Sequence, residues 1–218
     1  PFLFPDPVSV LAEENEYQIV LTDDFESYGE GALPSDRYRS VDEGWRVVSD
    51  GSGGKAVTAS VNETETLKVI QADCAYMDRG IAFDFKYDGE FKRWDGFYIR
   101  LASREDGTNR YYSLCPGFGS ANIVADANIK SAQEEMKPDT WYRCESSIKD
   151  GQMKIKVWER DQEEPADWDL TYSYGQLGGS AEDTYMEFML DARSGGSNVS
   201  ALVDNLEIGG WEEEPFIE

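Results

Sequence analysis

The chain has 218 residues, of which 40% are hydrophobic and 13% aromatic, so its composition is that of a globular protein and not of a disordered one. Its 44 acidic and 20 basic residues give a formal net charge of −24, which argues against nucleic acid and anionic membrane surfaces as partners. It has no histidine, so the usual general base and the commonest zinc ligand are missing, and no apolar run is long enough for membrane insertion.

Both ends of the chain have linker character. Residues 1–16 are a proline-rich lead-in with an acidic patch, and residues 209–218 form an acidic tail. We therefore expect a single domain over residues 17–208 that belongs to a larger multidomain protein. Three cysteines, Cys74, Cys115 and Cys144, leave open either one disulfide with a free thiol or three buried thiols.

Short segments with period-two alternation fill the predicted domain. The clearest is 80–87, where Ile81, Phe83 and Phe85 share one face, and the Asp150-Gly151 pair predicts a hairpin between 140–148 and 152–159. The other predicted strands are 17–25, 44–49, 56–61, 66–70, 96–101, 111–115, 185–191 and 201–208, and only 131–136 resembles a helix. This pattern predicts an all-β fold, an antiparallel β-sandwich or barrel.

Carboxylates interrupt the first and last predicted strands. If these strands are neighbours, their oxygen donors meet and need a cation, and hard oxygen ligands favour Ca²⁺. Asp204 has the same strand parity as Leu206 and Ile208, which predicts an inward-pointing side chain. We expect a structural Ca²⁺ held by Asp24, Glu26 and Asp204, with Asp23, Asn205 and carbonyls of the loop 51–54 as further donors. The alternative is that the first strand ends in solvent and Asp204 caps a turn.

Several short motifs resemble one class of extracellular domain. They are Thr22-Asp23-Asp24-Phe25-Glu26, Trp45 in Gly-Trp-Arg-Val, Trp141-Tyr142-Arg143, and Val203-Asp204-Asn205-Leu206-Glu207-Ile208. Over about 22–208 the chain resembles concanavalin A-like (laminin G-like) jelly-roll domains and calcium-containing β-sandwich carbohydrate-binding modules. The resemblance implies a jelly roll, a calcium ion that joins the terminal strands, and a glycan ligand.

Strand parity predicts a polar and aromatic face opposite the apolar one, if the strands concerned lie in one sheet. Such a face suits sugars, which need aromatic planes and paired polar groups. The predicted ligand-binding residues are Asp84, Lys86, Tyr98, Arg100, Tyr111, Glu187, Asp191 and Arg193, with Trp94 as an exposed stacking residue. The alternative is an ordinary solvated sheet face. We expect Trp45, Trp141 and Trp158 in the core, and Trp168 and Trp211 in either environment.

Catalysis is the main competing interpretation. The chain lacks the Glu-x-Asp-x-x-Glu motif of jelly-roll glucanases, and the absence of histidine removes the pair used by alginate-lyase-like sandwiches. Glu187 and Asp191 are about 13 Å apart along one strand, too far for a glycosidase pair. A pair formed by Asp84 and Glu187 across strands remains open.

We therefore expect a secreted or cell-surface module that binds a polysaccharide or oligosaccharide without catalysis. A glycoside hydrolase or polysaccharide lyase on the same fold is the first alternative. A laminin G-like adhesion module that binds protein is the second.

Overall fold

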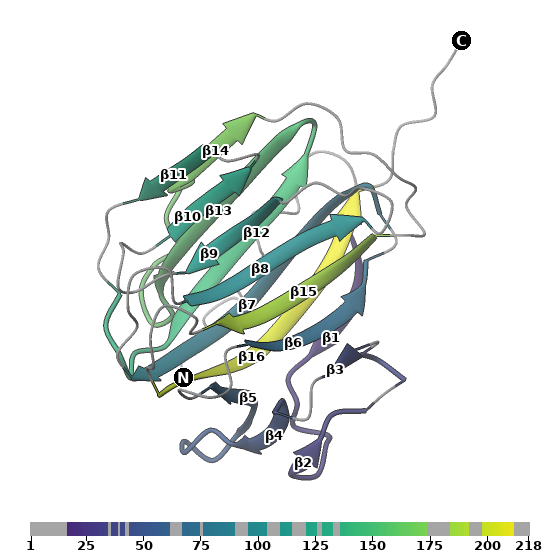
Figure 1. Ribbon diagram of the computed structural model, residues 1–218, viewed down its shortest axis with the longest axis vertical. Coiled ribbons are helices and arrows are strands. Elements are labelled where there is room, and N and C mark those ends of the chain that lie inside the picture. Colours follow the sequence, from purple (N-terminus) through teal and green to yellow (C-terminus); the bar gives the residue numbers. More distant parts are fainter. Residues whose placement is uncertain are drawn as a thin grey trace, which may run out of the picture.

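The computed structural model describes residues 17–34, 36–38, 40–41, 44–61, 67–74, 76–89, 96–103, 110–114, 121–125, 128–132, 136–173, 184–191 and 198–211. These residues form strands and turns, and they include no helix that could cross a membrane. Their strands pair into two antiparallel sheets that lie over one another (Figure 1).

Sheet A has nine strands. Its order is β14 (Leu170–Ser173), β13 (Gln152–Glu159), β12 (Tyr142–Lys149), β7 (Asp78–Gly89), β16 (Val199–Trp211), β5 (Lys55–Val61), β4 (Arg46–Ser49) and β2 (Gly31–Ala32). The ninth strand, β1 (Tyr17–Asp23), pairs with the second half of β16, on the side where β5 pairs with the first half, and Asp23 lies opposite Leu206. The first and last strands of the described chain are therefore neighbours, which is the condition that the calcium hypothesis assumes.

Sheet B has seven strands. Its order is β11 (Asn128–Ala132), β10 (Ala121–Ala125), β9 (Arg110–Leu114), β8 (Gly96–Ser103), β15 (Thr184–Asp191), β6 (Leu67–Asp73) and β3 (Ser40–Val41). The two sheets make the predicted all-β sandwich, with the core between them.

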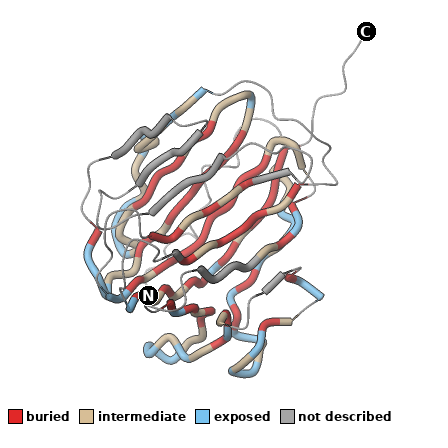
Figure 2. The backbone as a smooth tube through the Cα atoms, viewed as in Figure 1, coloured by how far each residue is buried: buried red, intermediate tan, exposed pale blue. Residues whose placement is uncertain are grey.

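Aromatic side chains from both sheets fill this core. The ring of Phe83, from sheet A, lies 4.8 Å from that of Phe188 and 5.8 Å from that of Phe97, both from sheet B. The central strands are the most deeply buried, and in β7 every residue from Arg79 to Phe85 is buried (Figure 2). Trp45 is buried as predicted.

Local predictions have mixed outcomes. The Asp150-Gly151 hairpin is confirmed, with positive φ at both residues, as a tight β-turn of the primed type requires. The predicted helix at 131–136 is wrong at 131–132, which end β11, and residues 209–211 continue β16 instead of starting a tail. Cys74 and Cys144 are buried free thiols.

Candidate functional site

The predicted ligand face is divided between the two sheets. Asp84 and Lys86 lie on β7 in sheet A, whereas Tyr98 and Arg100 lie on β8 and Glu187 lies on β15, both in sheet B. In each case the side chain points away from the core, so the two groups occupy opposite faces of the sandwich. The premise of a single face is wrong, and an acid–base pair of Asp84 with Glu187 is excluded.

The outer face of sheet B retains part of the predicted set. Arg100 forms an ion pair of 3.1 Å with Glu187, which also accepts a hydrogen bond from Gln71 Nε2. Tyr98 lies opposite Met189 in the next strand. Tyr111 and Asp191 are described by their backbone alone, in β9 and β15, and Trp94 and Arg193 lie outside the described residues. A role for these residues in ligand binding stays a prediction.

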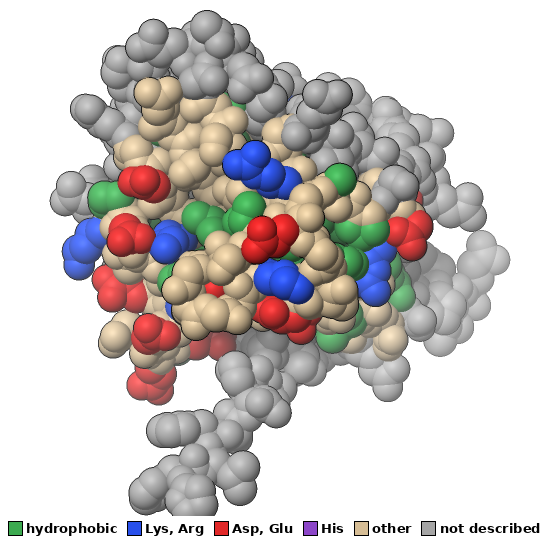
Figure 3. Space-filling model, turned by 90° about the horizontal axis from the view of Figure 1, so that it is seen from below, with side chains coloured by type: hydrophobic (Ala, Val, Ile, Leu, Met, Phe, Trp, Pro, Cys, Tyr) green, Lys and Arg blue, Asp and Glu red, His purple; other side chains and the backbone are tan. Residues whose placement is uncertain are grey.

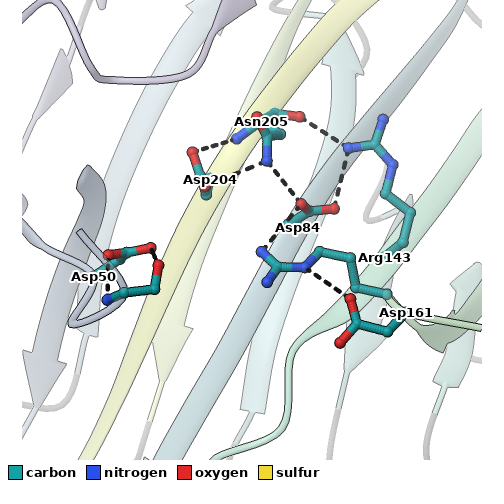
Figure 4. A network of polar contacts seen from close by, with 8 residues as sticks. Asp50, Asp84, Arg143, Asp161, Asp204 and Asn205 are labelled. Atoms are coloured by element: carbon teal, nitrogen blue, oxygen red, sulfur yellow. Dashed lines mark hydrogen bonds and ion pairs between the residues drawn. The ribbon is translucent and has the colours of Figure 1, made fainter. Parts of the chain in front are cut away.

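The outer face of sheet A carries a polar network centred on Asp84 (Figure 4). Its carboxylate accepts a hydrogen bond from Asn205 Nδ2 at 2.8 Å and pairs with Arg143 at 3.3 Å and Arg160 at 3.6 Å. Arg143 also donates to the carbonyl of Asn205 at 3.0 Å. Asp84 is only 4% exposed, so this arrangement holds a nearly buried carboxylate between two guanidinium groups.

A bulge in β16 places Asn205 in this network. The pairing with β7 shifts register between Asp204 and Glu207, and Asn205 adopts a φ of 47°. Asparagine tolerates this left-handed conformation better than most residues. The bulge thereby turns the Asn205 amide toward both Asp84 and Asp204.

A cavity of about 420 Å³ opens beside this network. Its lining combines one large aromatic ring with charged and amide side chains, which are Asp84, Arg143, Glu145, Trp158, Arg160, Gln162, Glu164 and Asn205. This volume is typical of a small-molecule site, and so is a combination of an aromatic surface with a few convergent polar groups.

Lys156 holds one wall of the cavity in place. Its side chain is almost fully buried and pairs with Glu145 at 3.4 Å and with Glu164. The ammonium also lies 5.4 Å from the ring centroid of Trp158 and 5.1 Å from that of Trp168. Asp169 accepts a hydrogen bond from the backbone of Val157. The segment 160–169 is thus fastened to β13 by charge, ring and backbone contacts.

Burial raises the pKa of two carboxyl groups on this face. For Glu145, burial is the main cause, and the ammonium of Lys156 opposes it. For Asp204, burial raises the pKa to about 6; the charge of Asp84, its partner across the strands, adds to the effect, and the backbone N–H of Asn205 opposes it. Asp204 therefore holds a proton at a higher pH than an ordinary aspartic acid.

The core prediction for Trp141 and Trp158 is wrong, since both lie on the outer face of sheet A and are partly exposed. Lys86 and Arg160 lie over the ring of Trp141, at 5.5 and 4.8 Å from its centroid. The sequence contains a signal for the position of Trp158. Period-two alternation places it on the same strand face as Lys154 and Lys156, and two lysines indicate an outer face. Trp211 is buried and Trp168 is half-buried.

The predicted calcium ligands do not converge. Asp24 accepts from the backbone of Glu26, and Glu26 Oε1 accepts from Lys55 N at 2.6 Å. Asp204 points outward beside Asp84 instead of inward. Within the described ranges, no group of three or more acidic, histidine or cysteine side chains is arranged for a metal ion.

The other proposed calcium donors are also engaged by the protein. Asp23 accepts hydrogen bonds from the hydroxyls of Tyr28 and Tyr38, at 2.6 and 2.8 Å. The ammonium of Lys55 binds the carbonyls of Glu26 at 2.8 Å and Tyr28 at 2.5 Å. A lysine thus supplies positive charge where the sequence predicts a calcium ion, and the residues present do not fit that ion.

Neither a family model nor a curated protein sequence matches this chain. Solved structures do. The alginate lyase Aly36B matches with a TM-score of 0.61 and 11% identity, over 88% of this chain and 98% of that chain. Domain 4 of AbnA, an extracellular arabinanase from Geobacillus stearothermophilus, solved with arabinotriose, matches with 0.55 and 14%, over 91% and 94%. The exoplasmic/lumenal domain of VIP36, in a Ca²⁺/Man3GlcNAc-bound form, matches with 0.51 and 9%, over 86% and 91%.

At these identities the likeness concerns the fold. The chain has the concanavalin A-like jelly-roll β-sandwich, an architecture found both in sugar-binding domains and in enzymes.

Proposed function

We propose that this domain binds carbohydrate without catalysis, through the cavity on the outer face of sheet A. The observation that carries the proposal is the combination of Trp158 with Arg143, Arg160, Asp84 and Gln162 around one cavity. An indole ring offers an apolar surface for the C–H face of a sugar, and guanidinium, carboxylate and amide groups can hydrogen-bond its hydroxyls.

The polar groups of the cavity are organised before any ligand binds. Asp84 is fixed by three partners, and Lys156 fastens the segment that carries Arg160, Gln162 and Glu164. Preorganisation reduces the entropy lost on binding, which favours affinity for a flexible glycan. Sugar-bound structures among the fold relatives support the same class of ligand. An extracellular location is part of this proposal, and recovery of the protein from the medium of its source cells tests it.

Affinity electrophoresis on immobilised polysaccharides tests the proposal. We expect Trp158→Ala to weaken the affinity for the polysaccharide by about tenfold or more, because the main stacking surface is lost. Lys154→Ala is the matched control, since Lys154 lies on the same face of β13 but outside the cavity lining. Every variant is checked by thermal unfolding. If Tyr98→Ala or Arg100→Ala weakens binding while Trp158→Ala does not, the site lies on sheet B.

One observation favours an enzyme as the second candidate. Asp84 and Asp204 are adjacent carboxyl groups on neighbouring strands, and the pKa of Asp204 is raised to about 6. A carboxyl group with a raised pKa beside a second carboxyl group is an arrangement that acid–base catalysis can use. Under the binding proposal, assays for new reducing ends and for unsaturated uronate products stay negative. Product formed by the wild type and lost in Asp204→Asn supports the enzyme.

A further inference from the structure

We infer that the cavity on sheet A selects neutral glycans and rejects polymers of uronic acids. This inference rests on the proposed function and adds the chemical class of the ligand. It follows from the charges that line the cavity and from the partners that each charge already has.

The cationic groups of the cavity are all paired within the protein. Arg143 and Arg160, which line the cavity, lie 3.3 and 3.6 Å from the oxygens of Asp84. Lys156 does not line the cavity, but it lies 3.4 Å from Glu145 and also contacts Glu164, which do. The lining thus has two guanidinium groups and three carboxylates, so it has no formal excess of positive charge. A uronate would have to compete with these internal carboxylates for each cation.

Further negative charge surrounds the cluster. Asp161 lies 3.9 Å from Arg160 Nε with an exposed side chain, and Asp204 adjoins Asp84. The whole chain carries a formal charge of −24. An anionic polymer is therefore repelled on approach, and burying its carboxylate beside Asp84, Glu145 or Glu164 adds a local cost.

A neutral sugar meets neither penalty. Its hydroxyls can donate to the carboxylate oxygens and accept from the remaining guanidinium N–H groups, so the paired charges stay in place. The C–H face of one ring can lie on Trp158, which needs no charge at all. The same set of side chains therefore disfavours an acidic sugar and suits a neutral one.

A matched pair of ligands tests the charge alone. Polygalacturonate and alginate are each compared with the same polymer after its carboxyl groups have been reduced to alcohols, and linear arabinan and mixed-linkage β-glucan serve as further neutral probes. We expect retention of neutral polymers at least about tenfold stronger than of their acidic counterparts. We also expect neutral binding to change less than about twofold between 50 and 500 mM NaCl, because no ion pair forms with the ligand.

The charge of the cavity can also be altered. Gln162 lines the cavity with an exposed side chain, so Gln162→Lys adds a cation to the lining. We expect this variant to lower the ratio of neutral to acidic binding by at least about threefold, with the gain for the acidic polymer lost at high salt.

The outcomes separate this inference from the proposed function. Equal or tighter binding of the acidic polymers, weakened by Trp158→Ala, overturns the inference and leaves carbohydrate binding at this site intact. Retention of no polymer, or retention unaffected by Trp158→Ala, contradicts the proposed function or its site.

Discussion

Asp204 illustrates how a single side chain on this sheet face responds to its surroundings. The pKa of its carboxyl is about 6 in the folded chain, against an ordinary value of 3.8, chiefly because of burial. The folded state therefore binds this proton more tightly than the unfolded state does. The resulting stabilisation is fully present below about pH 4 and is lost as the pH rises through about 6.

This linkage predicts a pH-dependent effect of Asp204→Asn. The difference between 3.8 and about 6 corresponds to about 3 kcal/mol. We expect the variant to be more stable than the wild type by up to about 3 kcal/mol at pH 7.5, and to match it within about 1 kcal/mol at pH 4. Urea unfolding of both proteins at the two pH values measures this. An identical difference at both values would show that Asp204 titrates normally.

At the scale of elements, β13 and the segment that follows it behave as one unit. Lys156 is 1% exposed and Glu145, its partner on β12, is 2% exposed. The segment 160–169 is attached to β13 through three of its residues: Glu164 and Trp168 contact Lys156, and Asp169 accepts a hydrogen bond from the backbone of Val157. The cavity wall therefore depends on one buried cation.

We expect Lys156→Met to destabilise the fold by about 3–5 kcal/mol, because it leaves Glu145 buried without its cation. The double variant Lys156→Met with Glu145→Gln should recover part of this loss, since the unpaired charge is removed. Urea unfolding measures both, and Lys154→Ala serves as the control. If the free energy of unfolding of Lys156→Met lies within about 1 kcal/mol of the wild-type value, the Lys156–Glu145 pair does not hold the cavity wall in place.

At the scale of the whole molecule, the sandwich is closed where β1 meets β16. Tyr17 and Trp211 pack with ring centroids 4.9 Å apart, and Lys55 binds the turn after β1. In the view from below in Figure 3, acidic and basic side chains of the described residues lie close to one another near the middle of the face. The junction of β1 with β16 is therefore held by strand pairing, by the packing of Tyr17 on Trp211 and by the ammonium of Lys55.

This arrangement predicts a domain whose stability does not depend on calcium. A structural ion present at 100 times its Kd adds about 2.7 kcal/mol, which for a chain of this size corresponds to a Tm shift of about 5–10 °C. We expect EDTA to change the Tm by less than about 1 °C, measured by calorimetry. Lys55→Ala should lower the Tm more than Lys154→Ala does. A fall in Tm with EDTA that added Ca²⁺ reverses would show that a calcium ion does stabilise the domain.

The sequence alone predicts most of the strands and the sandwich. Alternation along 80–87 and the Asp150-Gly151 turn are local signals, and the structure confirms both elements. The adjacency of the first and last strands, which the family resemblance implies and the calcium hypothesis assumes, is found in the structure, although the predicted ligands do not converge on a calcium site.

Only the tertiary structure decides which polar faces meet. Period-two alternation assigns a residue to a face of its own strand, but it does not say which sheet the strand joins, because strand pairing is a contact between distant parts of the chain. For this reason β7 and β8 separate into different sheets, Asp84 meets Arg143 and Asn205 instead of Glu187, and Trp158 lies in a cavity instead of the core.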